Sequence, residues 1–269
     1  MKLLSVFLIS VVLLLNSGCQ NAEPVVQQTT MQKIIERGVL VLGTSGNMAP
    51  MTRQLESGDV VGFDIDLAQV MADSINVGLK IEVMPIDELA AALESGKVDV
   101  VLSNYTATLD RNKQVAFVGP YLRSGKCLIT KDPFLAKTDA NASTSIENKN
   151  NKIAVLKGST SENMVKTLFK NARVVSVDDK DVGIAKVKSD EVVAMITDYP
   201  ICLSAIANNP DAGFISVFSR LTYEPISIAV GGRDPLFINW TQNFLSRVND
   251  TGYLNLLALK WFGSVVPES

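Results

Sequence analysis

Hydrophobic and polar positions follow one another along the chain in blocks that predict strands and helices in regular succession. Short apolar runs predict buried strands, and longer stretches with apolar residues three and four positions apart predict amphipathic helices. The predicted strands are residues 39–42, 80–84, 98–102, 153–156, 173–177 and 192–196. The predicted helices are residues 31–37, 64–75, 87–94 with Asp87 as its cap, 161–170, 181–188, one from Pro200 and two within 234–263. Strands that alternate with short helices are typical of βαβ units, so the chain is predicted to be an α/β protein with parallel sheets.

A polar stretch at residues 137–152 separates two copies of the same pattern. A β-α-β-α-β succession precedes this stretch, and another begins at residue 153. The duplication predicts two similar α/β lobes, although no sequence repeat can be aligned. With 269 residues the chain is long enough to bury a core in each lobe.

The first residues have the form of a secretory leader. One positive charge, Lys2, precedes an apolar run from Leu3 to Leu15, which is too short to cross a bilayer comfortably. We therefore expect residues 1–18 to be a signal peptide and the folded part of the chain to lie outside the cytoplasm.

Gly18-Cys19 resembles the cleavage site of bacterial lipoprotein precursors, whose cysteine becomes the acylated N-terminus. Those precursors usually have Leu three positions before the cysteine, where this chain has Asn16. The resemblance implies that Cys19 carries a lipid and that residues 19–30, which are polar and without period, form a tether to the membrane. The alternative is an ordinary secreted protein whose Cys19 falls within the discarded leader.

Composition and charge exclude several functional classes. The net charge of -3 arises from 25 basic and 28 acidic residues, and no basic cluster of the kind that binds nucleic acid is present in the sequence. The chain contains no histidine, which excludes histidine-based acid–base chemistry and most zinc sites. We therefore predict no metal, no cofactor and no nucleic-acid partner.

Two further cysteines, Cys127 and Cys202, lie in apolar surroundings. An exported chain can join such residues in a disulfide. Buried free cysteine also behaves as a small hydrophobic residue, and the apolar neighbours favour that interpretation. We expect two free thiols.

Polar side chains follow the predicted strand 98–102 and suggest a binding site. Ser103, Asn104 and Thr106 come directly after the strand, and Arg111 is the first strong cation beyond it. In parallel sheets ligands bind beyond the carboxyl ends of the strands. Small hydrogen-bonding groups followed by an arginine at this place suit a small anionic group, which a guanidinium holds with two hydrogen bonds.

The same segment resembles the core signature of the family 3 periplasmic solute-binding proteins, the amino-acid receptors of ABC importers. In that family the strand is followed by T-x-T-x-x-R and then by F-x-x-P-Y. The matching residues here are Thr106, Thr108, Arg111, Phe117, Pro120 and Tyr121. The ending K-W-F-G at residues 260–263 is also frequent in the family, and the resemblance extends from about Leu40 to Gly263.

The resemblance implies a two-lobed periplasmic binding protein fold of type II. Each lobe is expected to hold a mostly parallel sheet flanked by helices, with two strands as the hinge. The chain would cross to the second lobe at residues 125–130 and return at residues 222–230. Residues 31–125 with 226–269 would form lobe 1, and residues 126–225 would form lobe 2.

The resemblance also assigns roles to candidate ligand-binding residues. Arg111 would hold the ligand α-carboxylate together with Thr106, and Ser103 and Asn104 would line the floor of the site. The alternatives are a surface salt bridge from Arg111 to Asp110 and simple hydrogen bonding at the strand end.

The second lobe would complete the site. Ser159 and Thr160 match the turn that finishes binding the α-carboxylate, and Asp198 matches the aspartate that receives the α-ammonium. A helix start offers free amides and the positive end of a dipole. The simpler interpretations are a capping box between Ser159 and Glu162, and a helix cap at Asp198.

The expected side-chain pocket departs from the family pattern. Where members commonly show G-T-x-x-x-Y-x-P-F, this chain has methionines, Met48 and Met51, in place of both aromatic residues. Methionine is adaptable, so Met48 would form a soft wall against the ligand. Ser45 and Asn47 are neutral where binders of cationic amino acids frequently place an aspartate, which favours a ligand with an uncharged side chain. Alternatively, both methionines are ordinary core residues.

These expectations describe a monomeric binding protein, not an enzyme, that captures a small amino acid and delivers it to the permease of an ABC importer. One alternative is an enzyme on the same fold, similar to the dehydratase-like relatives of the family, with Glu224 or Asp198 as its acid. The other alternative is a sensory protein that presents the ligand to a receptor.

Overall fold

The structure, a computed structural model, describes residues 28–136, 146–218 and 222–263. The predictions made for the signal peptide, residues 1–18, and for Cys19 lie outside the described residues. Within the described part of the chain, no helix combines the length and the apolar character needed to cross a membrane.

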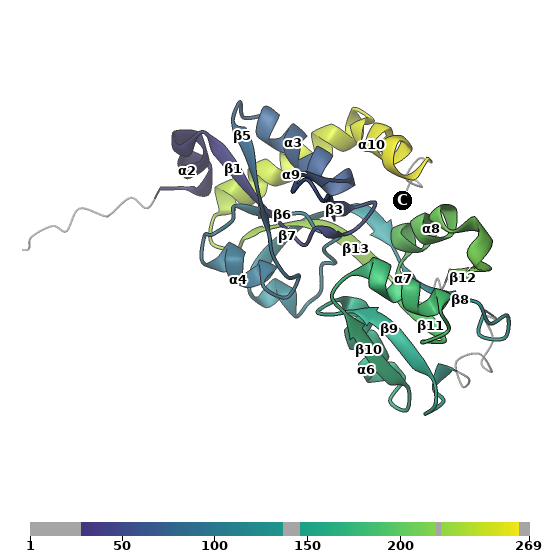
Figure 1. Ribbon diagram of the computed structural model, residues 1–269. Coiled ribbons are helices and arrows are strands. Elements are labelled where there is room, and N and C mark those ends of the chain that lie inside the picture. The colour runs from purple at the N-terminus through teal and green to yellow at the C-terminus, as the bar shows by residue number, and fades with distance from the viewer. Residues whose placement is uncertain (1–27, 137–145, 219–221, 264–269) are drawn as a thin grey trace, which may run out of the picture.

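The first lobe is built on a five-stranded sheet with the strand order β5-β1-β6-β13-β7 (Figure 1). Its strands are β1 (Val39–Thr44), β5 (Gly78–Val83), β6 (Val100–Val101), β7 (Val115–Ser124) and β13 (Glu224–Gly231). β1 pairs in parallel with β5 and β6, whereas β13 pairs antiparallel with β6 and β7. Within this sheet β13 therefore runs against the other strands.

The second lobe repeats this arrangement with the strand order β10-β9-β11-β8-β12. Its strands are β8 (Lys126–Thr130), β9 (Lys152–Leu156), β10 (Arg173–Val177), β11 (Ala194–Asp198) and β12 (Ile215–Phe218). β9 pairs in parallel with β10 and β11, and β8 pairs antiparallel with β11 and β12. A small antiparallel sheet of β2 (Asn47–Met48), β3 (Thr52–Gln54) and β4 (Val60–Val61) is added to the first lobe.

Helices flank both sheets (Figure 1). In the first lobe they are α2 (Thr30–Arg37), α3 (Phe63–Asp73), α4 (Leu89–Glu94), α9 (Pro235–Asp250) and α10 (Tyr253–Phe262). In the second lobe they are α6 (Thr160–Leu168), α7 (Lys180–Lys188) and α8 (Tyr199–Asn208). The predicted fold class, two α/β lobes with mostly parallel sheets between helices, is confirmed. The exact residues at which the chain passes between the lobes stay a prediction.

The strands are buried on both faces because their alternate residues enter different cores. In β1, Leu40 and Leu42 belong to one apolar cluster and Val41 to another. In β9, Ile153 and Val155 face one cluster while Ala154 faces the other. The sequence of a strand that is covered on both sides is a continuous apolar run, so apolar and polar residues do not alternate in these segments.

The prediction that Asp87 caps helix α4 is wrong. The helix begins at Leu89, and Glu88 stands at its N-cap without a capping side-chain bond. The amide of Glu88 donates to the carbonyl of Pro85 at 3.0 Å, so the chain makes a turn before the helix starts. That turn carries Asp87 past the position from which a side chain can cap.

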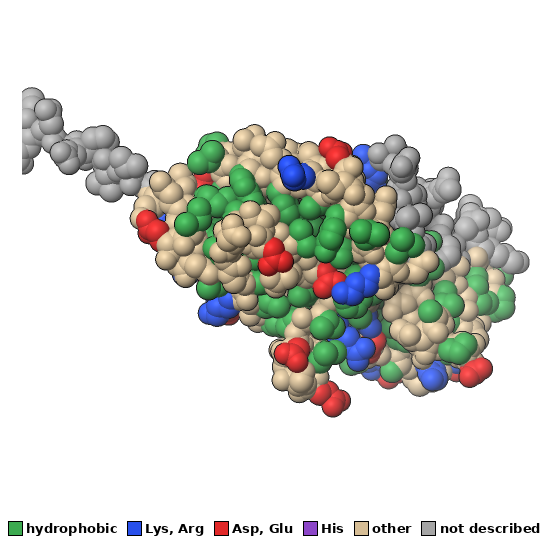
Figure 2. Space-filling view, turned by 90° about the horizontal axis from the view of Figure 1, so that it is seen from above, with side chains coloured by type: hydrophobic (Ala, Val, Ile, Leu, Met, Phe, Trp, Pro, Cys, Tyr) green, Lys and Arg blue, Asp and Glu red, His purple; other side chains and the backbone are tan. Residues whose placement is uncertain are grey.

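The C-terminal helix α10 returns to the first lobe and packs on α3. Oδ2 of Asp66 accepts hydrogen bonds from Lys260 Nζ and Trp261 Nε1, both at 2.6 Å. The ring of Phe262 stacks on that of Phe63 with 5.3 Å between centroids. From above, hydrophobic side chains gather among scattered charges over this side of the molecule (Figure 2). Leu256 and Leu259 of α10 are among the large hydrophobic residues that remain exposed.

The expectation of two free thiols is wrong, because Cys127 and Cys202 form a disulfide with a Cα–Cα distance of 6.5 Å. Cys127 lies on β8 directly opposite Thr197 of β11. Helix α8 starts immediately after β11 and turns back over the sheet, which brings Cys202 above Cys127. Both residues are buried in one apolar cluster, so burial and disulfide formation occur together.

Candidate functional site

The residues predicted for the site meet where the two lobes contact each other, a region here called the lobe interface. Three segments from the carboxyl ends of parallel strands converge there. They are residues 103–106 after β6, residues 157–160 after β9, and Asp198 at the end of β11. This is the edge of an α/β sheet at which ligands bind. Arg111, Lys126 and Glu224 complete the interface.

Arg111 lies at the start of the short helix η1 (Arg111–Lys113) and reaches toward the second lobe. Its guanidinium carbon stands 4.0 Å from the centroid of the Tyr105 ring. Nη1 donates to the carbonyl of Thr106 at 3.0 Å, and Nη2 donates to the carbonyl of Gly158 at 3.5 Å. Asp110 pairs with Lys113 at 2.7 Å, so the surface salt bridge between Arg111 and Asp110 does not form. Within the described chain no carboxylate pairs with Arg111.

The electrostatic surroundings of Arg111 are mixed. Burial lowers the pKa of the Arg111 guanidinium from its usual value, and Tyr105, Asp198 and Glu224 act in the opposite direction. Burial raises the pKa of Tyr105. Arg111 is therefore a desolvated cation within reach of two carboxylates that it does not contact directly.

Asp198 is buried and contacts both lobes. Its Oδ1 accepts a hydrogen bond from Lys126 Nζ at 2.5 Å, and its Oδ2 accepts one from Asn104 Nδ2 at 2.7 Å. Although Asp198 stands at the N-cap of α8, its side chain makes no capping bond. The simple helix-cap interpretation therefore fails, and the carboxylate points into the lobe interface instead.

Sequence reasoning missed Lys126 and gave Glu224 a role only in the enzyme alternative. Lys126 Nζ also donates to Thr160 Oγ1 at 2.5 Å and lies 3.4 Å from Glu224 Oε2. Thr160 Oγ1 donates to Glu224 Oε2 at 3.1 Å. The available signal was a lysine at the head of an apolar strand, where a charged side chain has no reason to be unless it is paired.

Helix capping and ligand binding were both considered for the start of α6, and Ser159 and Thr160 differ in this respect. Ser159 Oγ accepts from the amide of Glu162 at 3.2 Å, as in a capping box. The reciprocal bond differs, because Glu162 Oε2 accepts from the amide of Gly158 at 2.7 Å rather than from that of Ser159. Ser159 is thus engaged in the helix cap, and the Thr160 side chain faces the lobe interface.

Ser103 and Thr106 are held within the first lobe. Ser103 Oγ donates to Ser45 Oγ and accepts from the Ser45 amide, each at 2.9 Å. Thr106 forms an isolated antiparallel bridge with Ile226. The Ser103 side chain therefore ties the ends of β1 and β6 together, while Thr106 supports Arg111 through its carbonyl.

Asn104 is positioned by a buried carboxyl group, Asp64, in the first turn of α3. Asp64 accepts from the Asn104 amide at 2.6 Å and from Tyr121 Oη at 2.7 Å. Burial raises the pKa of Asp64 from 3.8 to about 7, while both hydrogen bonds oppose the shift. Asn104 has a φ of 47°, a conformation that asparagine tolerates better than most residues. Asp64 thereby fixes the residue that contacts Asp198.

Met48 and Met51 have different places. Met51 is fully buried in a core cluster of the first lobe, as the core interpretation held. Met48 belongs to a second cluster that contains Ile86 from the first lobe and Leu156 and Ile201 from the second. Met48 therefore lies in the apolar part of the lobe interface.

The lobes are in close contact beside this apolar cluster. Asn47 Nδ2 donates to the carbonyl of Asp178 in the second lobe at 2.6 Å. Gly158 has a φ of +72°, and a Cβ added there would stand 2.9 Å from Ile86 Cγ2. Gly158 thus permits an approach of the two lobes that a larger residue would obstruct.

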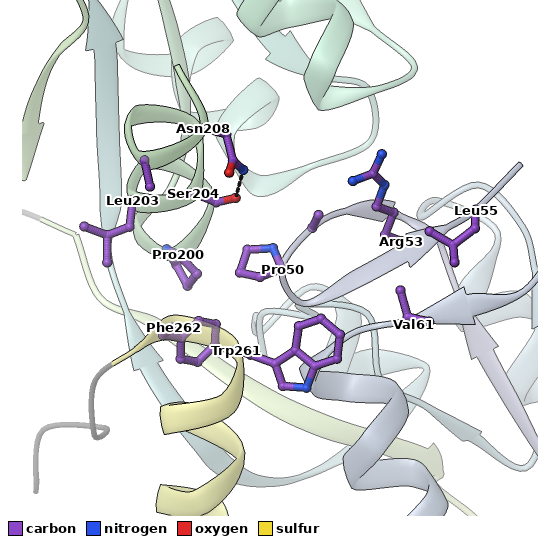
Figure 3. A pocket seen from close by; sticks show the side chains of 12 residues that line it. Pro50, Arg53, Leu55, Val61, Pro200, Leu203, Ser204, Asn208, Trp261 and Phe262 are labelled. Atoms are coloured by element: carbon purple, nitrogen blue, oxygen red, sulfur yellow. Dashed lines mark hydrogen bonds between the residues drawn. The ribbon is translucent and has the colours of Figure 1, made fainter. Parts of the chain in front are cut away.

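A separate pocket of about 510 Å³ lies between the small sheet of the first lobe, α8 and the end of α10 (Figure 3). Figure 3 shows Pro50, Pro200 and Trp261 around its centre, with Arg53 toward one side. Arg53 is the charged residue in its lining, and none of the residues predicted for the ligand site lines it. The paired charges of the lobe interface are absent from this lining, so we place the candidate site at the interface itself. Within the described ranges no group of histidine, cysteine, aspartate and glutamate residues is arranged to hold a metal ion.

Comparisons with known proteins agree with this architecture. An L-cystine-binding protein of Escherichia coli (strain K12) is 25% identical over 241 residues, which cover 88% of either chain. A cyclohexadienyl dehydratase of Pseudomonas aeruginosa is 30% identical over 176 residues, or 64% of this chain and 63% of the dehydratase. A putative binding component of an ABC transporter from Wolinella succinogenes, complexed with lysine, matches with a TM-score of 0.78 and 30% identity. That match covers 84% of this chain and 96% of the other.

A family model gives the assignment. The model described as bacterial extracellular solute-binding proteins, family 3, matches residues 40–264, which is most of the chain. Relatives named as binding proteins for L-cystine, histidine and arginine are among the matches, together with the dehydratase. The chain therefore belongs to the bacterial extracellular solute-binding proteins of family 3.

Proposed function

We propose that the protein captures an α-amino acid with an uncharged side chain between its lobes and delivers it to an ABC importer. The observation that carries this proposal is a complementary set of incompletely matched charges at the lobe interface. Among the described residues, Arg111 has no carboxylate partner, while Asp198 and Glu224 share the ammonium of Lys126. An α-amino acid has one carboxylate, which would pair with Arg111, and one ammonium, which would pair with Asp198 and Glu224.

Arg111 and the start of α6 form the half suited to the ligand carboxylate. A guanidinium can direct two parallel N–H groups at a carboxylate. The first amides of α6, at Thr160 and Ser161, have no helix carbonyl before them to accept their hydrogen bonds. The bond from Arg111 to the carbonyl of Gly158 brings this helix start close to the guanidinium. A carboxylate bound here would join the two lobes.

Asp198, Asn104 and Glu224 form the half suited to the ligand ammonium. Asn104 Oδ1 is buried and accepts no hydrogen bond from the described residues, while its Nδ2 donates to Asp198. Buried polar atoms in proteins nearly always have a partner, so this oxygen favours a ligand donor. An ammonium group offers three N–H donors, enough for Asn104 Oδ1 and both carboxylates.

The apolar part of the interface favours an uncharged ligand side chain. The cluster around Met48 contains the apolar residues Ile86, Leu156 and Ile201, which come from both lobes. Met48 adapts its shape easily, so we propose that it contacts the ligand side chain. Asn47 is neutral and is engaged with Asp178, which leaves no acid at this position for a cationic side chain.

We propose further that the lobes move as hinged bodies. Residues 31–125 with 226–269 would form one body and residues 126–225 the other, with Gly125 and the segment before Ile226 as the hinge. The bonds from Asn104 to Asp198 and from Arg111 to Gly158 support a closed arrangement that a ligand would stabilise. The relative from Wolinella succinogenes is named as a component of an ABC transporter, which supports delivery to such an importer.

The position of the protein in the cell is part of the same proposal. A signal peptide at residues 1–18, a lipid on Cys19 and a tether to residue 30 would hold a monomeric binding protein at the membrane outside the cytoplasm. The polar segment before α2 and the membership in an extracellular family support this arrangement.

Dehydration is the second candidate function, because a cyclohexadienyl dehydratase is among the relatives and Glu224 is a buried acid at the interface. Asp198 and Glu224 both contact the Lys126 ammonium. Lys126 thus contacts both candidate acids, and the sequence offers no histidine as another proton donor, so we propose that the protein is not an enzyme.

A thermal-shift screen of residues 20–269 against individual amino acids tests the proposal. A ligand at 100 times its dissociation constant should add about 2.7 kcal/mol to the free energy of unfolding. We expect the largest increase for an amino acid with an uncharged side chain. A screen in which no amino acid raises the midpoint would contradict the function.

The enzyme alternative is tested on the same samples. The protein is incubated with the best ligand and with a cyclohexadienyl carboxylic acid, and the small molecules are then recovered and identified by mass spectrometry. Binding without conversion supports a transport protein, whereas a dehydrated product would identify an enzyme.

A further inference from the structure

Lys126 is a buried lysine at the lobe interface. Its side chain is 3% exposed, and its position at the head of β8 places it directly opposite Asp198 in the sheet. Its three partners are Asp198 Oδ1, Thr160 Oγ1 and Glu224 Oε2. Nζ donates hydrogen bonds to Asp198 Oδ1 and Thr160 Oγ1 and lies at an ion-pair distance of 3.4 Å from Glu224 Oε2, so these three contacts hold the ammonium in place.

The charges at the interface can be counted. Asp198 and Glu224 supply two negative charges, and Lys126 and Arg111 supply two positive charges. Lys126 stands between the two carboxylates, whereas Arg111 contacts carbonyl oxygens and the Tyr105 ring. Lys126 therefore balances one of the two negative charges, and the second remains available for a ligand ammonium.

This balance of charges at the lobe interface determines which ligands can be buried there without leaving a charge unpaired. A neutral amino acid places its carboxylate on Arg111 and its ammonium on the carboxylate pair, so every charge has a counterpart. A cationic amino acid adds a second positive charge beside Lys126. Buried charges are costly unless they are paired, so this extra cation is disfavoured.

From this geometry we infer that Lys126 is a specificity-determining residue, a built-in cation that restricts the site to amino acids without net charge. The inference rests on the proposed function, because it concerns the charge class of the same ligand. Replacing Lys126 with a neutral residue leaves one carboxylate unbalanced, and a cationic side chain can then take the place of the lysine ammonium. Lys126→Met should therefore shift the preference of the site toward cationic amino acids.

The experiment compares ligands that match in shape and differ in charge. Calorimetric titrations use three pairs of increasing length: L-2-aminobutyrate with L-2,4-diaminobutyrate, L-norleucine with L-lysine, and L-citrulline with L-arginine. For the pair that fits, wild-type protein should bind the neutral member more tightly. In Lys126→Met the ratio of the two dissociation constants should change at least tenfold in favour of the cation.

Three variants separate charge from shape and from general damage. Lys126→Arg keeps the cation and should keep the neutral preference. Lys126→Met combined with Glu224→Gln restores the charge balance and should return the preference toward the neutral ligand. Lys131→Met removes a lysine that pairs with Asp190 away from the site, and it should behave as wild type. Lys126→Gln replaces the methionine variant if the latter fails to fold, as judged by circular dichroism.

The outcomes distinguish failure of the role of Lys126 from failure of the proposed amino-acid binding. If wild-type protein binds neutral amino acids and Lys126→Met keeps the same charge preference, the inference is wrong and the proposed function stands. Tight binding of arginine or lysine by the wild type also overturns the inference. If neither the wild type nor the variants bind any amino acid, the proposed function fails and the role of Lys126 fails with it.

Discussion

The side-chain amide of Asn104 donates a hydrogen bond of 2.7 Å to Oδ2 of Asp198 and thereby joins the two lobes. The backbone of Asn104 is in turn held by Asp64, which is buried in the first lobe. A chain of hydrogen bonds thus runs from Tyr121 and Asp64 through Asn104 to Asp198. Changes at either end of this chain should be measurable in stability or in binding.

Asp64 should make stability depend on pH. Because burial raises the pKa of folded Asp64 from 3.8 to about 7, the folded state holds this proton more tightly than the unfolded chain does. The resulting stability is complete below pH 3.8 and is lost as the pH rises to about 7. Relative to Asp64→Asn, which cannot ionise, the wild-type free energy of unfolding should fall by roughly 4 kcal/mol across this range.

Denaturant titrations at several pH values measure this difference. Asp73→Asn removes an exposed carboxylate at the other end of α3 and serves as the matched control. Wild-type protein and Asp64→Asn showing parallel pH profiles would contradict the assignment.

Arg111→Ala should abolish most ligand binding. The substitution removes the cation proposed for the ligand carboxylate and leaves that carboxylate buried without a partner. Removing one member of a buried charge pair costs about 3–5 kcal/mol, so the dissociation constant should rise by more than about a hundredfold. Calorimetric titration with the best amino acid from the screen measures the effect. Arg123→Ala, an exposed arginine on β7, should bind normally, and equal loss in both variants would refute the specific role of Arg111.

Asp198→Asn should remove the preference for a ligand amine. The variant keeps the shape of the side chain but loses the negative charge next to Lys126 and Asn104. We expect about a hundredfold weaker binding of the amino acid. The 2-hydroxy analogue of the same ligand, which lacks the ammonium, should lose far less affinity. A uniform loss for both compounds would point to a structural role for Asp198 instead.

The disulfide should protect Cys127 and Cys202 from alkylation. Unreduced protein treated with iodoacetamide should gain no label on either residue, and its mass should be lower by that of two hydrogen atoms. The bridge closes a loop across a sequence separation of 75. In the chain-entropy model such a loop stabilises the folded state by roughly 4 kcal/mol, so the double variant to alanine should lose about that much. Labelling of both cysteines in the absence of reductant would show that the bridge does not form.

Cys19→Ser should release the protein from the membrane. The prediction rests on Gly18-Cys19 after the apolar leader, since these residues lie outside the described part of the chain. Fractionation should place wild-type protein with membranes and the variant in the soluble fraction, with unchanged ligand affinity. Wild-type protein that is soluble after export and carries no acyl mass would disprove the anchor.

Local patterns were sufficient to predict the main elements of the fold. Helix α2 ends at Arg37, as predicted, and helices α9 and α10 fall within the predicted range. The spacing of Thr106 and Arg111 after a buried strand was enough to place an arginine near the end of β6. These features depend on residues a few positions apart, so the sequence carries them directly.

Other features depend on contacts between distant residues. Lys126 and Asp198 are 72 positions apart, and they meet because β8 pairs with β11 in one particular register. The same pairing brings Cys127 under Cys202. The apolar neighbours of the two cysteines had suggested free thiols instead. A one-residue slip of β8 would turn Lys126 away from the interface, because successive side chains of a strand point to opposite faces.

The sequence by itself determined that the chain forms two α/β lobes and that an arginine follows a strand end in the first of them. Only the tertiary structure decided which charges lie near Arg111. It also decided that Lys126 contacts both Asp198 and Glu224. The physical reason is that the periodicity of strands and helices depends on residues that are close together in the sequence. The balance of buried charge depends on which distant segments the packing brings together.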